Sequence, residues 1–325
     1  MTRLRRLGLW LVLATVTLLL AIASPTFRTV LNAQNVLEQT SLLGIVACGM
    51  AVMMISGGFD LSVGAVGASA SVVGAIVAAH VGGPLTLVAG LLVGLALGFA
   101  NGYLIAKVRI NAFVATFAMS NIVSGVLFTV TDAQSHVGAP ALLTTAATGR
   151  VLGVPTLFLV FVAVLAATWF VLTRTKFGHY VYSVGGNAEA SHLSGVPVQR
   201  VQIFAFATGG VLAGAAGLLL LGQTQVGQPS AAQAWPLNAI AICVVGGVAL
   251  TGGVGRIEDV FAATLLLGVI ANGLNQLNVS PYWQPAITGL VILVAVVLDQ
   301  YNRRRTPGRR AGNPAEPSRP TALVG

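Results

Sequence analysis

The sequence predicts an all-helical protein that crosses a membrane many times. Only 8% of its 325 residues are charged and 56% are hydrophobic, whereas soluble domains carry roughly 25% charged residues. The mean hydropathy is +0.88, and apolar runs of about 20 residues, the length that crosses a hydrocarbon layer, recur along the chain. These observations favour a single polytopic membrane domain over residues 1–300.

Ten spans account for the apolar runs. The first has a basic start and a short apolar core, which also fits a signal peptide, but a retained helix is favoured because many spans follow. The segment that contains Asp132, His136 and Arg150 is too polar in patches to cross. The spans are expected at about 7–23, 38–56, 61–80, 84–106, 113–130, 156–173, 201–221, 236–251, 259–275 and 285–298.

The distribution of basic residues tests this count. With the N-terminus inside, only Arg28 and Arg150 of the 17 Lys and Arg residues lie outside. This is the asymmetry that the positive-inside rule requires, so both termini are expected in the cytoplasm. Residues 301–325, rich in Pro and Arg, are predicted to form a disordered basic tail. A role in topology is favoured for its arginines over contact with anionic lipid.

Small residues are spaced for close helix packing. Glycines every fourth residue line one face of the fourth expected span, and a similar series occurs in the seventh. Such faces let helix backbones approach each other in a membrane. The residues are Gly90, Gly94, Gly98 and Gly102, and then Gly210, Gly214 and Gly217.

Two short matches indicate a candidate internal repeat. Ala-Asn-Gly at 100–102 recurs at 271–273, and glycine-rich turns at 57–67 and 246–255 precede them in the same order. Five spans separate the copies, and an odd number places them in opposite orientations, as in many transporters. Chance similarity is the alternative.

A few polar residues lie at membrane depth. Asp60 is either a gate or pathway residue or a helix cap, because a carboxylate before a span can accept free backbone N–H groups. Asn101, Asn272 and Asn275 could line a passage for a hydroxyl-rich solute. Hydrogen bonding between helices is the structural alternative for these amides.

The longest polar interval between apolar blocks is residues 174–200. Within it, Asn187 is a good N-cap, Glu189 suits a first helical turn, and Gly195 followed by Pro197 can end the helix. We expect a two-turn helix on the cytoplasmic face that a soluble motor protein grips. The alternative is an interfacial helix with no partner.

Several functions are excluded or disfavoured. Neither lysine, Lys107 or Lys176, follows a glycine, so a P-loop for ATP is absent from the sequence. The four histidines lack the spacing of metal ligands, and no acid–base or nucleophile set is recognisable. Cys48 and Cys243 are expected to pack as small hydrophobic residues. Because the basic residues cluster between apolar blocks, nucleic acid is not expected as a partner, and no cofactor or metal is implied.

Five segments carry a resemblance to a known family. They read GGFDLSVGA (57–65), ANGYLIAKVRINAFVATFAM (100–119), RTKFGHYVYSVGGNAEASHLSGVPVQRV (174–201), GGVALTGGVG (246–255) and VSPYWQPAITGLVILVAVVLD (279–299). Together they make residues 35–300 resemble the permease subunits of bacterial ABC importers for ribose and related monosaccharides, in the branched-chain-permease superfamily. The Asp-Leu-Ser of the first glycine turn favours the sugar branch.

The resemblance implies a multi-pass protein of the bacterial inner (plasma) membrane with several partners. These are a separate ABC ATPase subunit, a solute-binding protein outside, and a second permease copy or paralogue that completes a dimer. It also implies a coupling segment that the ATPase moves. The residues assigned to it are Gly185, Gly186, Asn187, Glu189, Ala190, Ser194 and Gly195.

Departures from the family pattern leave other functions open. Trp235 to Asn238 replace an acidic residue followed by Leu-Asp-Ala, and Glu258 and Asp259 stand where relatives carry small residues. A furanose-like signalling molecule or a polyol is the alternative substrate. A self-sufficient secondary carrier or channel is the alternative from another class, and an intramembrane enzyme lacks a catalytic set.

Overall fold

The computed structural model describes residues 3–283, 286–287, 289–290 and 293. In this part of the chain, seven helices are long and apolar enough to cross a membrane, and two shorter apolar helices accompany them. The predicted all-helical membrane fold is therefore confirmed. The expected span at 285–298 lies mostly outside the described residues, and the tail at 301–325 lies wholly outside them. The count of ten spans and the cytoplasmic termini stay predictions.

The seven long apolar helices follow the expected order. They are α2 (Val30–Ile55), α3 (Val63–His80), α4 (Pro84–Ala106), α5 (Ala112–Thr131), α7 (Thr156–Arg174), α10 (Val198–Thr224) and α12 (Ile257–Gln276). The remaining helices are α1 (Arg3–Ala23), α6 (Ala141–Thr148), α8 (Lys176–Gly186), α9 (Ala188–Leu193) and α11 (Trp235–Val245), with 3-10 turns η1 (Thr26–Arg28) and η2 (Pro281–Trp283).

Four two-residue strands form two small antiparallel pairs. The strands β1 (His136–Val137) and β4 (Val226–Gly227) pair, as do β2 (Arg150–Val151) and β3 (Val154–Pro155). The polar segment 132–155 therefore folds into α6 and short strands rather than a span, as predicted.

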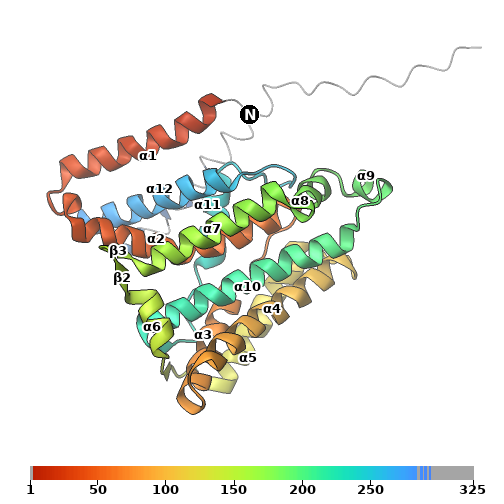
Figure 1. The fold of residues 1–325 in the computed structure, drawn as a ribbon, viewed down its shortest axis with the longest axis horizontal. Coiled ribbons are helices and arrows are strands. Elements are labelled where there is room, and N and C mark those ends of the chain that lie inside the picture. The colour runs from red at the N-terminus through yellow and green to blue at the C-terminus, as the bar shows by residue number, and fades with distance from the viewer. Residues whose placement is uncertain (1–2, 284–285, 288, 291–292, 294–325) are drawn as a thin grey trace, which may run out of the picture.

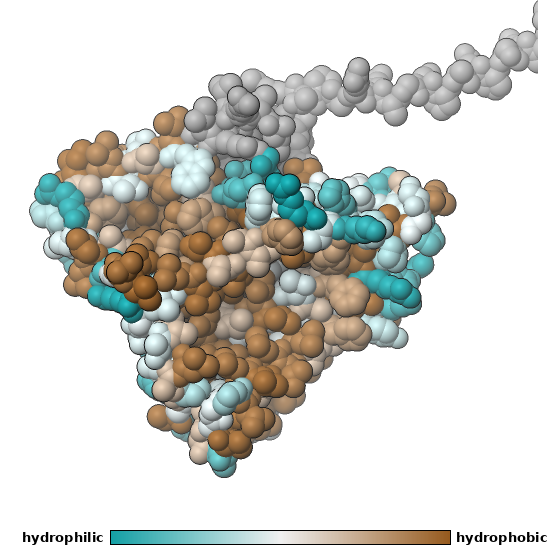
Figure 2. Space-filling model, in the orientation of Figure 1, coloured by the Kyte–Doolittle hydropathy of each residue, from teal (hydrophilic) through white to brown (hydrophobic). Residues whose placement is uncertain are grey.

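The long helices give the molecule two distinct ends (Figure 1). At one end, here the α9 end, α2, α4 and α7 finish, α10 and α12 begin, and α8 and α9 protrude. At the other, here the α6 end, lie α6 and the short strands. Figure 2 shows hydrophobic side chains over the helices between, with hydrophilic ones gathered toward the ends. Among the described basic side chains, Arg28 and Arg150 lie at the α6 end, the two residues that the charge pattern placed outside.

The core is built around α2 and α10. From Thr40 to Ile55 every residue of α2 is buried except the half-buried Leu43, so α2 is enclosed by other helices rather than amphipathic. The predicted glycine faces meet: a methyl group on Gly98 would lie 2.6 Å from the Phe206 carbonyl oxygen, and one on Gly102 would lie 2.8 Å from the Ile203 Cα. This confirms that α4 and α10 pack backbone to backbone.

Helix α2 begins eight residues before the expected span because polar residues extend it at the α6 end. The Thr29 hydroxyl oxygen caps the helix by accepting from the Asn32 backbone N–H at 3.2 Å. The Asn32 amide is buried, donates to the Phe27 carbonyl and accepts from Gln276 at 2.7 Å. Hydropathy alone excluded these residues, but their side chains are satisfied by neighbouring helices.

The expected eighth span, 236–251, is wrong as a continuous helix. Helix α11 has only 11 residues, about half the length that crosses a bilayer. After β4 the chain runs without a helix into the bundle, where the Ala232 carbonyl lies against Gly64 and the Trp235 ring lies against Gly67. Helix α11 then stops at Gly246 and Gly247, the latter with φ 77°. Irregular backbone is tolerated at this depth because protein covers it.

The candidate inverted repeat stays a prediction. The Gly253 backbone N–H donates to the Ile55 carbonyl at 2.9 Å, so the turns near 57 and 252 lie together toward the α9 end. The two Ala-Asn-Gly segments do lie toward opposite ends. Gly102 packs against the start of α10, whereas α12 finishes beside η1, where Thr26 donates to Gln276.

Candidate coupling site at the α9 end

Helix α8 connects the membrane helices to the exposed segment. The Thr175 hydroxyl oxygen caps it by accepting from the Gly178 N–H at 3.2 Å. Its apolar face buries Gly178, Val181 and Val184 against the core. The exposed residues on the other side are Lys176, His179, Tyr180 and Ser183. One face of α8 is therefore packed on the bundle.

Helix α9 has a defined cap at each end, as the sequence predicts. The Asn187 side-chain oxygen accepts from the Ala190 N–H at 2.9 Å. At the other end Gly195 has φ 81°; its N–H donates to the His192 carbonyl at 2.9 Å, and the Val196 N–H donates to the Ser191 carbonyl at 3.0 Å. These two bonds form a Schellman motif, which rigidifies a helix of only six residues.

Helix α9 presents nearly all of its side chains outward. Ser191 is its one buried residue, and Leu193, at its tip, is 82% exposed. Of the seven residues assigned to the coupling segment, Gly185 is half-buried. The other six, Gly186, Asn187, Glu189, Ala190, Ser194 and Gly195, are exposed. A capped helix with an exposed leucine at its tip is a suitable surface for a protein partner.

Two glycine turns from distant parts of the chain meet the C-terminal end of α8. We call Gly57, Gly185, Gly252 and Gly253 the glycine junction. A methyl group on Gly185 would collide with the Ile55 carbonyl oxygen, and one on Gly252 would lie 2.8 Å from the Gly57 Cα. Gly57, Gly252 and Gly253 also have positive φ values, which favour glycine. The junction therefore joins the end of α8 directly to the end of α2 and to the turn before α12.

Side-chain bonds connect α7 and α8 to the start of α12. The Tyr182 hydroxyl donates to the Gly255 carbonyl at 2.9 Å, and the Trp169 indole N–H donates to Glu258 at 3.0 Å. Arg256 also pairs with Glu258, at 3.2 Å. Burial, with a contribution from the Glu258 charge, raises the pKa of the Tyr182 hydroxyl. Glu258, which departs from the family pattern, thus has a structural role here.

A buried polar cluster lies next to the junction along the chain. We call Asp60, Ser62, Asn101 and Thr116 the Asp60 cluster; each is 0% exposed. Asp60 accepts from the Ser62 N–H and hydroxyl, both at 2.6 Å, and from the Asn101 amide at 3.1 Å. The Asn101 amide also donates to the Ser62 hydroxyl at 2.8 Å, and the Leu61 N–H donates to the Thr116 hydroxyl at 3.0 Å. The cluster fastens together the start of α3, the last part of α4 and the start of α5.

Asp60 is not the N-cap of α3. Ser62 occupies that position without a side-chain capping bond. The Asp60 carboxylate instead accepts from the backbone N–H of Ser62, two residues further on, and so forms a local turn before the helix. Burial raises the pKa of the Asp60 carboxyl, against the opposing effect of the bonds from Ser62 and Asn101. The Asn101 side-chain oxygen is buried without a hydrogen-bond partner among the described residues.

The four residues proposed for a pathway or gate are only partly brought together. Asp60 and Asn101 are in contact, whereas Asn272 and Asn275 lie near the far end of α12, toward the α6 end. Asn272 is 3% exposed. The structure thus separates the four into a bonded pair at one end and two amides at the other.

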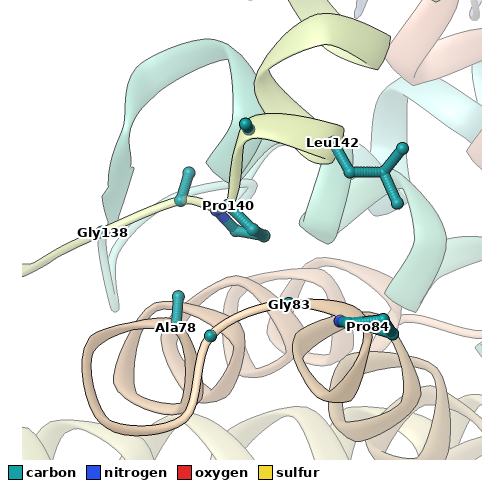
Figure 3. A pocket seen from close by; sticks show the side chains of 9 residues that line it. Ala78, Gly83, Pro84, Gly138, Pro140 and Leu142 are labelled. Atoms are coloured by element: carbon teal, nitrogen blue, oxygen red, sulfur yellow. The ribbon is translucent and has the colours of Figure 1, made fainter.

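The α6 end carries a shallow apolar pocket (Figure 3). Its volume is about 480 Å³. The segment with Gly138, Pro140 and Leu142 forms one wall, and Ala78, Gly83 and Pro84 form the other. Small residues on both walls leave backbone accessible at the end opposite α9.

Sequence reasoning missed several residues of the site. Leu193 looked like an ordinary helix residue, and no sequence pattern linked Tyr182 to Gly255, its partner 73 residues away. Ser62 and Thr116 carried a weak signal, because both lie in the quoted family segments beside Asp60 and Asn101.

A bundle of long apolar helices with a short capped helix exposed at one end is the architecture of a multi-pass membrane protein. The chain belongs to the family described as the permease component of the branched-chain amino acid transport system, whose profile matches residues 32–296. Members are permease components rather than enzymes and lie in the inner membrane, and ATP is hydrolysed by a separate ATPase subunit. The family also implies a binding protein and a second permease as partners.

Curated relatives match nearly the whole chain. It is 38% identical to the ribose import permease protein RbsC of Escherichia coli strain K12, over 85% of this chain and 88% of that protein. It is 37% identical to the L-arabinose transport system permease protein AraH of the same strain, over 91% of each. The RbsC of Bacillus subtilis strain 168 is 35% identical, over 91% and 93%. No solved structure matches the chain significantly.

Proposed function

We propose that the chain is the membrane-spanning permease subunit of an ATP-driven importer for a ribose-like monosaccharide. An ATPase subunit docks on α9, a solute-binding protein docks on the α6 end, and a second permease copy completes the pathway. The single observation that carries the assignment of the α9 end is that α9 is capped, exposed and connected to the core through the glycine junction. The names of the relatives support a sugar as substrate.

The coupling path follows from the contacts. A force on α9 acts on α8 through Asn187, which lies directly between them. Because the glycine junction has no room between backbones, α8 cannot shift without moving the end of α2 and the turn before α12. The segment after Gly57 leads into the Asp60 cluster, which holds α3, α4 and α5 together. ATP-driven closure of the ATPase subunits would thereby shift the equilibrium between two arrangements of the membrane helices.

Two leucine variants test the docking surface. Leu193→Asp places a charge on the exposed tip of α9 and should abolish copurification of the ATPase subunit, with ATP-driven uptake lost as well. Leu152→Asp is the matched control for copurification of the ATPase, because Leu152 is 100% exposed but lies in the β2–β3 turn at the α6 end, away from α9. Full copurification with Leu193→Asp would contradict docking on α9.

The substrate requires a separate test, because specificity in such systems resides largely in the binding protein. Uptake into proteoliposomes that hold the permease and its ATPase is measured with candidate binding proteins added one at a time. Ribose or arabinose uptake is the expected result. Uptake of only a furanose-like signalling molecule or a polyol would favour the alternative substrates.

A further inference from the structure

A groove at the α9 end gathers positive charge. It has a volume of about 660 Å³ and lies between the end of α4 and the segment from α9 to the start of α10. Lys107, Arg109, His192 and Arg200 line it, and we call these four the basic groove; Glu189 is its one acidic lining residue. The side chains of Lys107, Arg109 and Arg200 make no hydrogen bond or ion pair with the described residues.

An exposed apolar strip begins just below these charges. On α4, Tyr103 and Phe99 lie four and eight residues before Lys107 and are 48% and 49% exposed. On α10, Phe204 follows Arg200 by four residues and is 57% exposed. Side chains four residues apart lie on one face of a helix, so each helix has a cation at its end and aromatic rings beneath it.

The two strips lie on the same side of the helix pair. Helices α4 and α10 are antiparallel and in contact through Gly98, Gly102, Ile203 and Gly210. At about 100° per residue, Tyr103 follows Gly102, and Phe204 follows Ile203, by the same rotation away from the contact. Because the helices are antiparallel, equal rotations bring both rings to the same face of the pair.

We propose that the basic groove binds the phosphate headgroup of an anionic phospholipid, with its acyl chains along Tyr103, Phe99 and Phe204. The groove lies where the candidate span α4 ends and the candidate span α10 begins, which is the level of lipid headgroups. Unpaired cations at this level attract anionic lipid. A soluble phosphate fits the charges equally well but leaves the aromatic strip uncovered, and an acidic protein segment leaves it uncovered too.

The test uses the full-length chain in detergent, with bound phosphatidylglycerol counted by native mass spectrometry. Replacing Lys107→Gln, Arg109→Gln and Arg200→Gln together should weaken retention roughly 100-fold, since each basic residue contributes about fivefold. The matched control, Arg174→Gln with Lys176→Gln and Arg256→Gln, removes the same charge from the same end and should retain lipid like the unmodified chain. Equal loss in both triple variants, or no loss in the groove variant, would overturn the proposal.

Further experiments distinguish a lipid headgroup from a soluble anion and from a second copy of the chain. Inorganic phosphate alone should not displace phosphatidylglycerol, and Phe204→Gln should weaken retention of the lipid without changing that of phosphate. If phosphate displaces phosphatidylglycerol, or if Phe204→Gln leaves lipid retention unchanged, the groove binds a soluble anion and the proposal is overturned. Disulfide cross-linking of two chains that each carry Phe204→Cys would show a second copy over the strip and also overturn it.

Discussion

At the residue scale, the site depends on positions where one side chain, or its absence, decides a contact. Gly185 and Asp60 are the clearest. The first admits no side chain because backbone surrounds it, and the second is a carboxylate that is fully buried but receives hydrogen bonds from three donors.

Gly185→Ala should block coupling. Its methyl group would collide with the Ile55 carbonyl and lie 2.6 Å from the Gly253 nitrogen, whereas Gly186, the next residue, has open space. We expect Gly185→Ala to lose ATP-driven uptake and to lower the thermal unfolding midpoint. Gly186→Ala is the control and should change neither by much. Normal uptake in Gly185→Ala would mean that the glycine junction is not a transmission contact.

Asp60→Ala should destabilise the protein more than Asp60→Asn. The alanine variant leaves the Ser62 and Asn101 donors unpaired in a buried site, which costs about 1–3 kcal/mol. In Asp60→Asn the amide oxygen still accepts from Ser62, and the amide nitrogen can donate to the Asn101 oxygen, which has no partner among the described residues. Thermal unfolding of the two purified variants checks the order, and equal destabilisation would contradict it.

The raised pKa of Asp60 gives this comparison a pH dependence. The folded protein binds a proton to Asp60 at a higher pH than the unfolded chain does. The contribution of Asp60 to stability therefore falls as the pH rises from the ordinary carboxyl pKa to the raised one. Asp60→Asn should lack this decrease, and an identical pH profile for both proteins would argue against it.

At the scale of elements, the short helix α9 is the part that the sequence predicts best. Its caps are local: Asn187 and Gly195 act within three residues of the groups they bond. Long apolar helices are equally predictable, because hydropathy alone identifies α3, α4, α5 and α7 nearly to the residue. The broken span at α11 was not predictable. Its apolar composition fits a full helix. The irregular backbone of residues 228–235 is instead covered by α3, a long-range contact that the local sequence does not predict.

The same reasoning explains which site contacts were hidden. The glycine junction joins two turns, near residues 57 and 252, to the end of α8 at Gly185, and no local sequence pattern predicts that these three segments are in contact. The Asp60–Asn101 bond spans 41 residues, so each residue was noticed but not their contact.

Gly195→Ala should loosen α9 without filling any space. Nothing lies within 4 Å of an added methyl group, so only the positive φ is strained, at about 1 kcal/mol. Hydrogen exchange of the amides of residues 191–196 should accelerate roughly fivefold. Gly195→Asn tests the cause, because asparagine tolerates this conformation and should exchange at close to the original rate. Equal acceleration in both variants would rule out backbone strain as the reason.

At the scale of the whole molecule, function requires that the α9 end faces the cytoplasm and the α6 end faces outward. Both native cysteines, Cys48 and Cys243, are fully buried. A thiol reagent should therefore label an introduced surface cysteine without labelling the native ones. An impermeant thiol reagent should label Ser194→Cys only from the inside and Leu152→Cys only from the outside. Labelling both from one side would contradict the arrangement.

The most direct test of the account is sugar uptake into proteoliposomes, measured with and without the ATPase subunit in the presence of the binding protein. We predict uptake only when the ATPase and ATP are both present, and none with Leu193→Asp although the isolated ATPase still hydrolyses ATP. Uptake by this chain alone, driven by an ion gradient, would contradict the claim that a separate motor acts on it through α9.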